Sequence, residues 1–265
     1  MIPYPEIDPY IFRIGPIGPR WYGLMYLIGF LFSYLLVLYQ IKKKKLAISR
    51  KTVESLYFYL IVGLFLGARL GYVLIYNLSY YLENPLNVFA VWHGGMSFHG
   101  GLIGAILAGI LFTFRNRLDF WLLADLIAVT APIGVGLGRI GNFINAELYG
   151  RATDVPWAMV FPGAGDIPRH PSQLYGAVLE GFLLFLILWF LKDRVSKKGI
   201  FLSAFLILYG ASRFFVEFFR EPDVQLGFIL GPFTMGQLLS SGMILIGIVL
   251  FLVRKYPYNT PPTPL

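Results

Sequence analysis

The sequence contains no cysteine and only three histidines among its 265 residues. The absence of cysteine excludes disulfides, cysteine-ligated zinc, iron–sulfur clusters and a thiol nucleophile supplied by the protein. The three histidines do not show metal-binding spacing, so no metal and no other cofactor is expected. Any sulfur chemistry must therefore come from a substrate.

Charge is also scarce, because only 14 % of the residues are charged, whereas 57 % are hydrophobic and 17 % are aromatic. With a mean hydropathy of +0.68, this composition excludes an ordinary soluble domain and predicts an all-α polytopic membrane protein. The net charge of +8 is typical of the positive-inside rule and of affinity for anionic membrane lipids. Nucleic acid is not expected as a partner.

Seven apolar runs are long enough to form transmembrane helices, since about 20 helical residues cover the roughly 30 Å of hydrocarbon. We expect a single integral-membrane domain over residues 1–265. Its predicted spans are 22–41, 53–75, 96–114, 120–137, 173–191, 200–218 and 234–253, followed by a tail at 254–265. Residues 1–20 contain five prolines and lack the basic start and cleavage site of a signal peptide, so no cleavage is expected.

The distribution of lysine and arginine predicts the orientation. The first span ends on four consecutive lysines, Lys42–Lys45, which mark the cytoplasmic side. Alternation then puts the basic residues at 42–51, 115–117, 192–198 and 254–255 on that side, 14 of the 22 lysines and arginines. Six lie outside and two within spans. This asymmetry predicts an outer N-terminus and a cytoplasmic C-terminus.

The densest group of polar residues lies at 138–151, with two arginines, two asparagines, a glutamate and three glycines directly after the apolar run 120–137. At a helix end near the membrane surface, these side chains offer guanidinium and amide donors to an anionic or carbonyl group. Gly136, Gly138 and Gly141 also match the GxGxxG pattern. They follow a long apolar segment and not a short strand, so a dinucleotide-binding turn is not expected.

Ionisable residues in or beside the spans are costly in lipid and must face protein or water. These residues are Arg69, His99, Asp125, Arg139, Glu147, Glu180, Arg213 and Glu217. Alternation of the spans places Arg69, Arg139 and Arg213 in the outer half of the membrane, together with His99 and Glu217. Three arginines against one or two carboxylates indicate a cavity of positive potential that suits an anion such as a phospholipid phosphate.

Structural interpretations of the same residues stay open. Arg213 can pair with Glu217 at i, i+4 on one helix, and Arg69 can pair with Glu147. Asp125, in the inner half, is expected to make a hydrogen bond between helices. The pairs Gly67 with Gly71, Gly100 with Gly104, and Gly134 with Gly138 favour close helix packing.

His99 precedes two glycines, which leave room for a substrate beside its ring. Because histidine titrates near neutral pH, His99 is the candidate proton acceptor at that depth.

Several segments of the chain resemble the bacterial prolipoprotein diacylglyceryl transferase family. The matching segments are 21–26 (WYGLMY), 98–104 (FHGGLIG), 138–151, 169–175 (RHPSQLY), 209–210 (YG) and 213–220 (RFFVEFFR). They extend over nearly the whole chain, and the segment 138–151 is similar to the signature of the family.

The resemblance implies a reaction. The diacylglyceryl group of phosphatidylglycerol is transferred to the lipobox cysteine thiol of a prolipoprotein signal peptide, a thioether forms, and glycerol phosphate is released. This is the first step of lipoprotein maturation. The implied partners are phosphatidylglycerol, the precursor and membrane lipids. The implied location is the bacterial inner membrane, with the active site toward the outer leaflet.

Motif matching also implies which residues act. The implied catalytic residues are His99, Arg139, Arg213 and Glu217. The implied substrate-binding residues are Tyr22, Asn142, Glu147, Gly150, Tyr209 and Arg220. Arg69 joins this group because of its predicted depth in the outer half of the membrane. Either His99 or a thiol pKa lowered by arginine can supply the thiolate.

The chain departs from the family pattern at three positions. His93 replaces a frequent acidic residue, Ala146 a common glycine, and Gly176 a frequent glutamate.

Two other functions compete with a transferase. A lipid or anion transporter also places arginines and glycines in the membrane, but it is expected to show broken helices in two matching halves, and the sequence has no internal repeat. A structural scaffold has no need of the polar segment 138–151.

Overall fold

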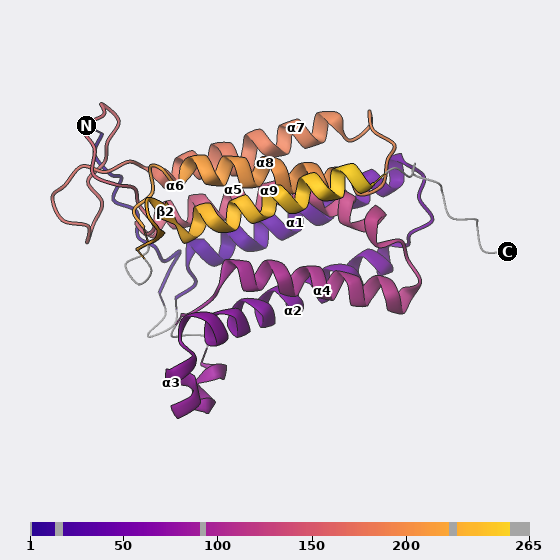
Figure 1. The fold of residues 1–265 in the computed structure, drawn as a ribbon, viewed down its shortest axis with the longest axis horizontal. Coiled ribbons are helices and arrows are strands. Elements are labelled where there is room, and N and C mark those ends of the chain that lie inside the picture. Colours follow the sequence, from indigo (N-terminus) through magenta and orange to yellow (C-terminus); the bar gives the residue numbers. More distant parts are fainter. Residues whose placement is uncertain (1, 14–17, 91–93, 223–226, 255–265) are drawn as a thin grey trace. The chain divides into compact units, whose positions relative to one another are not determined.

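The structure is a computed structural model that describes residues 2–13, 18–90, 94–222 and 227–254 (Figure 1). It divides into two compact units. The first combines the chain up to Gln40 with the chain from Ala124 onward, and the second covers Ile41–Leu123.

Helices make up most of both units. They are α1 (Trp21–Lys43), α2 (Arg50–Gly71), the π-helix η1 (Tyr72–Tyr76), α3 (Leu78–Glu83), the 3₁₀-helix η2 (Pro85–Phe89), α4 (Phe98–Asn116), α5 (Phe120–Ile144), α6 (Ser172–Gly176), the π-helix η4 (Ala177–Leu183), α7 (Leu184–Leu191), α8 (Ile200–Val216) and α9 (Met235–Val253). Strands β1 (Phe228–Leu230) and β2 (Phe233–Thr234) pair antiparallel before α9. Each predicted span coincides with a helix or a continuous helical run. Of the predicted tail, residues 255–265 lie outside the described residues.

Five helical runs of the described chain are long and apolar enough to cross a membrane. They are 21–43, 50–76, 120–144, 172–191 and 235–253. Helix α8 is apolar but shorter, with 17 residues. Large apolar side chains such as Leu27, Phe65 and Leu252 are more than half exposed, which suits contact with lipid. These features support a helical polytopic membrane protein, while the number of seven spans and their orientation stay predictions.

In the second unit, glycines bring α2 and α4 into close contact (Figure 1). A Cβ atom added to Gly67 would lie 2.7 Å from the Cα of Gly104, and one added to Gly71 would lie 2.7 Å from the Cα of Gly100. No side chain larger than hydrogen fits between these backbones. The predicted close packing at these two glycine pairs is confirmed.

In the first unit, α5 extends seven residues beyond the predicted end at 137 and includes Arg139 and Asn142. A Cβ atom at Gly136 would lie 3.0 Å from the Cα of Gly181 in η4, and one at Gly141 would lie 2.8 Å from the ring of Tyr22. The GxGxxG pattern therefore marks helix packing, as expected. The helix continues because nothing in residues 138–144 breaks it, and it ends where Ala146 adopts a positive φ of 54°.

Asp125 connects α5 to the beginning of α8. Its carboxylate accepts hydrogen bonds from the backbone N–H groups of Gly199 and Leu202, both at 2.8 Å, and the residue is 2 % exposed. A negative group at a helix N-terminus satisfies donors that lack partners within the helix. The predicted structural role of Asp125 between helices is confirmed.

Candidate active site

The polar segment after α5 folds around Glu147. Its carboxylate accepts hydrogen bonds from the side-chain amides of Asn142, at 2.8 Å, and Asn145, at 3.2 Å. The hydroxyl of Tyr22 interacts with Asn142 and with the charge of Glu147. Three of the predicted substrate-binding residues, Tyr22, Asn142 and Glu147, therefore lie together.

The backbone conformation at Ala146 explains why glycine is common at this position in the family. Ala146 and Leu148 have φ values of 54° and 56°, in the left-handed region that glycine adopts without strain. A glycine at position 146 would remove the steric cost of the Ala146 Cβ atom. The alanine is tolerated because the turn is held on both sides, by the bond from the Ala146 N–H to the Phe143 carbonyl and by the bond from Gln173 Nε2 to the Glu147 carbonyl.

Gly150 is the point where three chain segments meet. Its N–H donates to the His170 carbonyl at 2.8 Å, and it forms a bridge with Arg220. The His170 Nδ1 lies 3.1 Å from the Tyr175 hydroxyl, and partial burial lowers the pKa of His170 below its ordinary value. The shift favours the neutral form of this imidazole, which acts as a hydrogen-bond partner.

Arg139 is held by Glu180, a residue that the sequence analysis did not assign to the site. Glu180 lies in η4 and is 0 % exposed. Its Oε2 accepts a hydrogen bond from Nε of Arg139 at 2.9 Å and forms an ion pair with Nη2 of the same arginine, also at 2.9 Å. Its Oε1 lies 3.7 Å from Nη1 of Arg213. One buried carboxylate thus faces two of the predicted catalytic arginines.

Arg213 is held by a second glutamate. Its Nη2 lies 2.5 Å from Oε2 of Glu217, so the i, i+4 pair that the sequence left open as an alternative is present. Oε1 of Glu217 accepts from Arg220 at 3.4 Å and from the Thr234 hydroxyl at 3.1 Å. Gly236 leaves space for this carboxylate, because a Cβ atom there would lie 2.6 Å from its Cδ.

These contacts define the arginine–glutamate cluster, which consists of Arg139, Glu180, Arg213, Glu217 and Arg220. Three guanidinium groups against two carboxylates leave one net positive charge. The side chains of Arg139 and Arg213 are 19 % and 14 % exposed, whereas those of the two glutamates are 0 % and 2 % exposed. Arg139 and Arg213 therefore keep exposed surface, whereas both glutamates and Arg220 are buried. The buried Tyr209 interacts with the charges of this cluster.

Arg69 belongs to the second unit and has a different environment. Its Nε donates to the carbonyl of Val88, its Nη1 to those of Gly94 and Gly95, and its Nη2 to those of Asn87 and Ala90, at 2.6–3.2 Å. These bonds use all five N–H donors of the guanidinium. All of these bonds lie within the second unit, so they give no support to the alternative pairing of Arg69 with Glu147.

His99 is the second residue of α4 and also belongs to the second unit. Ser97 begins this helix as its N-cap and accepts from the backbone N–H of Gly100 at 3.2 Å. The Ser97 N–H in turn donates to the Ala68 carbonyl at 2.8 Å, which joins the start of α4 to the end of α2. His93, a departure from the family pattern, lies outside the described residues.

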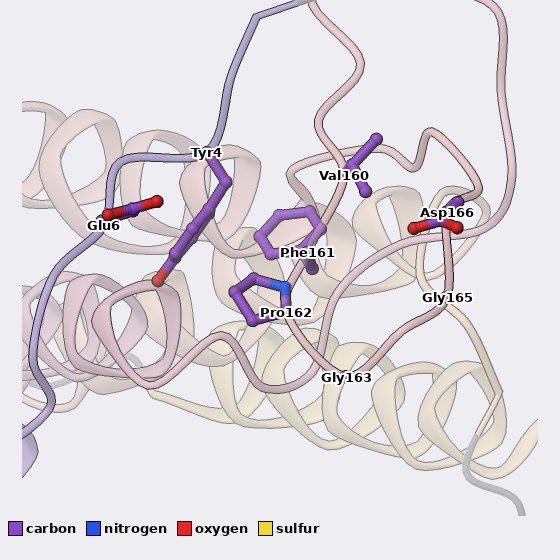
Figure 2. A pocket seen from close by; sticks show the side chains of 8 residues that line it. All are labelled: Tyr4, Glu6, Val160, Phe161, Pro162, Gly163, Gly165 and Asp166. Carbon is purple, nitrogen blue, oxygen red and sulfur yellow. The ribbon is translucent and has the colours of Figure 1, made fainter.

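A cavity of about 510 Å³ lies in the loops of the first unit, and Figure 2 shows the side chains that line it. It is lined by Tyr4, Glu6, Val160, Phe161, Pro162, Gly163, Gly165 and Asp166. The Tyr4 hydroxyl donates to the Phe143 carbonyl at 2.6 Å, which ties the N-terminal segment to the end of α5. None of the predicted site residues lines this cavity.

The described residues therefore define a helical membrane protein in which buried glutamates orient arginines toward accessible space. A family model described as prolipoprotein diacylglyceryl transferase matches residues 9–253, and the chain belongs to this family.

Relatives named phosphatidylglycerol–prolipoprotein diacylglyceryl transferase cover nearly the whole chain. The relative from Geobacter sulfurreducens is 56 % identical over 93 % of this chain and 95 % of its own length. Those from Desulfotalea psychrophila and Pasteurella multocida are each 54 % identical, over 94 % of this chain and 94 % and 93 % of their own lengths.

Proposed function

We propose that this protein transfers the diacylglyceryl group of phosphatidylglycerol to the lipobox cysteine of prolipoproteins. The cysteine sulfur forms a bond to the terminal glyceryl carbon of the diacylglycerol, and the bond from that carbon to the phosphate oxygen breaks. The thiol proton leaves with a base, and glycerol phosphate carries away the electron pair of the broken bond. Membership of the family and the names of the relatives support this reaction.

The arginine–glutamate cluster is the observation that carries the proposal. A phosphodiester has one negative charge, which the one net positive charge of the cluster matches. As the carbon–oxygen bond breaks, further charge develops on the phosphate, and preorganised guanidinium groups stabilise that charge more than they stabilise the bound lipid. Arg139 and Arg213 are the groups in position for this role, because both keep exposed side-chain surface.

The other predicted residues take supporting roles in this proposal. Glu217 and Arg220 hold the cluster together, and Tyr209 lies beside it. Tyr22 and its polar neighbours bind the uncharged part of the head group or the peptide. Arg69 organises residues 87–90 and 94–95 and does not bind phosphate directly, because its five donors are bonded to backbone carbonyls.

The orientation is part of the proposal. Seven spans with the N-terminus outside would put the cluster in the outer half of the bacterial inner membrane. In this cysteine-free chain, single cysteines at the exposed positions Lys43 and Asp154 test it in intact cells with an impermeant thiol reagent. Asp154→Cys should be labelled and Lys43→Cys protected. The reverse pattern would refute the orientation and put the site in the opposite leaflet.

The transfer reaction itself is tested with purified protein, phosphatidylglycerol labelled in its terminal glycerol, and a peptide with a lipobox cysteine. Labelled glycerol phosphate should appear at the same rate as lipidated peptide. Serine in place of the peptide cysteine should stop both products, since an alcohol is a far poorer nucleophile than a thiol near neutral pH. Release of label without peptide would indicate a phospholipase, and intact lipid throughout would indicate a transporter.

The same assay tests His99, which we assign as the acceptor of the thiol proton. His99→Ala should lower the rate near neutral pH and regain part of it as the pH rises toward the pKa of the thiol, because the solution then supplies thiolate. An unchanged pH profile with weaker lipid binding would make His99 a residue that positions the lipid.

A further inference from the structure

Glu180 is a buried carboxylate within the arginine–glutamate cluster. It is 0 % exposed and lies in the π-helical segment η4, where the backbone departs from the regular α-helix. Such segments are frequent at functional sites. Its Oε2 accepts a hydrogen bond from Nε of Arg139 and lies 2.9 Å from Nη2 of the same arginine, whereas no hydrogen bond within the described residues reaches its Oε1, which lies 3.7 Å from Arg213.

We propose that Glu180 is a positioning residue that fixes the guanidinium of Arg139, and through its second oxygen that of Arg213, for contact with the phosphate. This inference rests on the proposed function. An arginine side chain has many rotamers, and a guanidinium that is free to move cannot be preorganised for a developing charge. The hydrogen bond from Nε and the ion pair of Nη2 with the same carboxylate oxygen restrict that freedom for Arg139.

The net charge of the cluster also supports a positioning role for Glu180. Glu180 and Glu217 together leave the cluster with one net positive charge against a phosphodiester of one negative charge. Without Glu180 the cluster would carry two net positive charges in a site with little solvent, where unpaired charge is strongly unfavourable. The guanidinium groups would then separate to reduce their repulsion. Loss of the carboxylate should therefore displace Arg139 and Arg213 even when the helices stay in place.

Gly176 provides a position from which a second carboxylate can reach Arg139. It lies one helical turn before Glu180, and a Cβ atom added there would lie 3.2 Å from both Cδ and Nε of Arg139. At this distance the arginine stem must shift by a few tenths of an ångström, which a flexible side chain can do. A glutamate at position 176 can thus replace the charge that a neutral residue at position 180 removes.

The experiment compares kcat and KM for lipid transfer to a lipobox peptide in four purified variants. These are Glu180→Gln, Glu180→Asp, the double variant Gly176→Glu/Glu180→Gln, and its uncharged control Gly176→Gln/Glu180→Gln. Glu180→Gln should lower kcat about tenfold to a hundredfold, the loss expected when reacting groups are misplaced by about 1 Å. The charged double variant should recover at least about fivefold of that loss, and the uncharged double variant should recover nothing.

The Glu180→Asp variant distinguishes a role of Glu180 in positioning the arginines from a role in packing. Aspartate keeps the charge but leaves a larger void than glutamine, so a role in positioning requires Asp to be more active than Gln. A packing role requires the reverse, with both variants differing from the native protein mainly in the temperature of unfolding. Greater activity of Gln than of Asp, or equal activity of the two double variants, would overturn the proposal. Should the native protein transfer no lipid, the proposed function itself would fail, which is a different result.

Discussion

Arg139→Lys and Arg213→Lys should each lower kcat/KM for lipid transfer by about a hundredfold or more, which is about 2.7 kcal/mol of lost transition-state stabilisation. Lysine keeps the charge but presents a compact ammonium in place of a planar fork. In the structure, Nε and Nη2 of Arg139 face Glu180, while Nη1 and Nη2 of Arg213 face Glu180 and Glu217, so each planar guanidinium is fixed by carboxylates and keeps part of its surface exposed. An ammonium group cannot reach the buried carboxylate and the lipid in the same geometry.

Arg50→Lys is the matched control for this substitution. Arg50 pairs with Glu54 at 3.0 Å on an exposed helix face, and its side chain is 75 % exposed. Exposed pairs of this kind contribute little, so the control should transfer lipid at the native rate. Near-native rates for both Arg139→Lys and Arg213→Lys would contradict the idea that these arginines contact the phosphate with two donors.

Much of the fold follows from the sequence because helix formation in an apolar run is a local property. In lipid every backbone N–H and C=O group must be bonded within the segment, so an apolar run of about 20 residues has few alternatives to a helix. The glycine pairs of α2 and α4 could be predicted for a similar reason, since their spacing places both members on one helix face. The predicted helix boundaries were less accurate than the predicted helices themselves. Helix α5, for example, continues through the polar residues that had suggested its end.

The composition of the cluster could not be predicted in the same way, because it depends on how helices rotate against each other. Arg69 and Glu180 carry the same sequence signal, a charged residue within an apolar run. Only the structure shows that Arg69 is bonded to backbone carbonyls while Glu180 faces Arg139. The π-helical segment η4 adds to the difficulty, since it changes the direction in which Glu180 points relative to a regular α-helix.

Arg220 illustrates a second limit of prediction from sequence. The resemblance to the family indicated that this residue matters, but not what it contacts. Its place in the cluster depends on the bridge between Gly150 and Arg220, which joins segments 70 residues apart in the chain. Pairings of this kind leave no local pattern. The glycine that permits the bridge is the better signal, because glycine is often retained where backbones approach closely.

Gly150→Ala should therefore cause a large loss of both stability and activity. A Cβ atom at position 150 would lie 2.6 Å from the His170 carbonyl oxygen and closer still to that of Phe219. Both obstacles are backbone atoms, which cannot move away as a flexible side chain can. The junction of the three segments that meet at Gly150 must open, and Arg220 moves with it. We expect a loss of about 1–3 kcal/mol in unfolding free energy and a fall in kcat/KM of about a hundredfold.

The measurement is thermal unfolding of the purified variant together with its transfer rate at a temperature where it is folded. Gly242→Ala is the control, because a Cβ atom there has no heavy atom within 4 Å and alanine favours the helical backbone of α9. It should leave both quantities unchanged or raise the stability slightly. If Gly150→Ala unfolds at the native temperature and transfers lipid at the native rate, the junction of the three segments does not position Arg220. The cluster would then be held by its two glutamates alone, Glu180 in η4 and Glu217 at the end of α8.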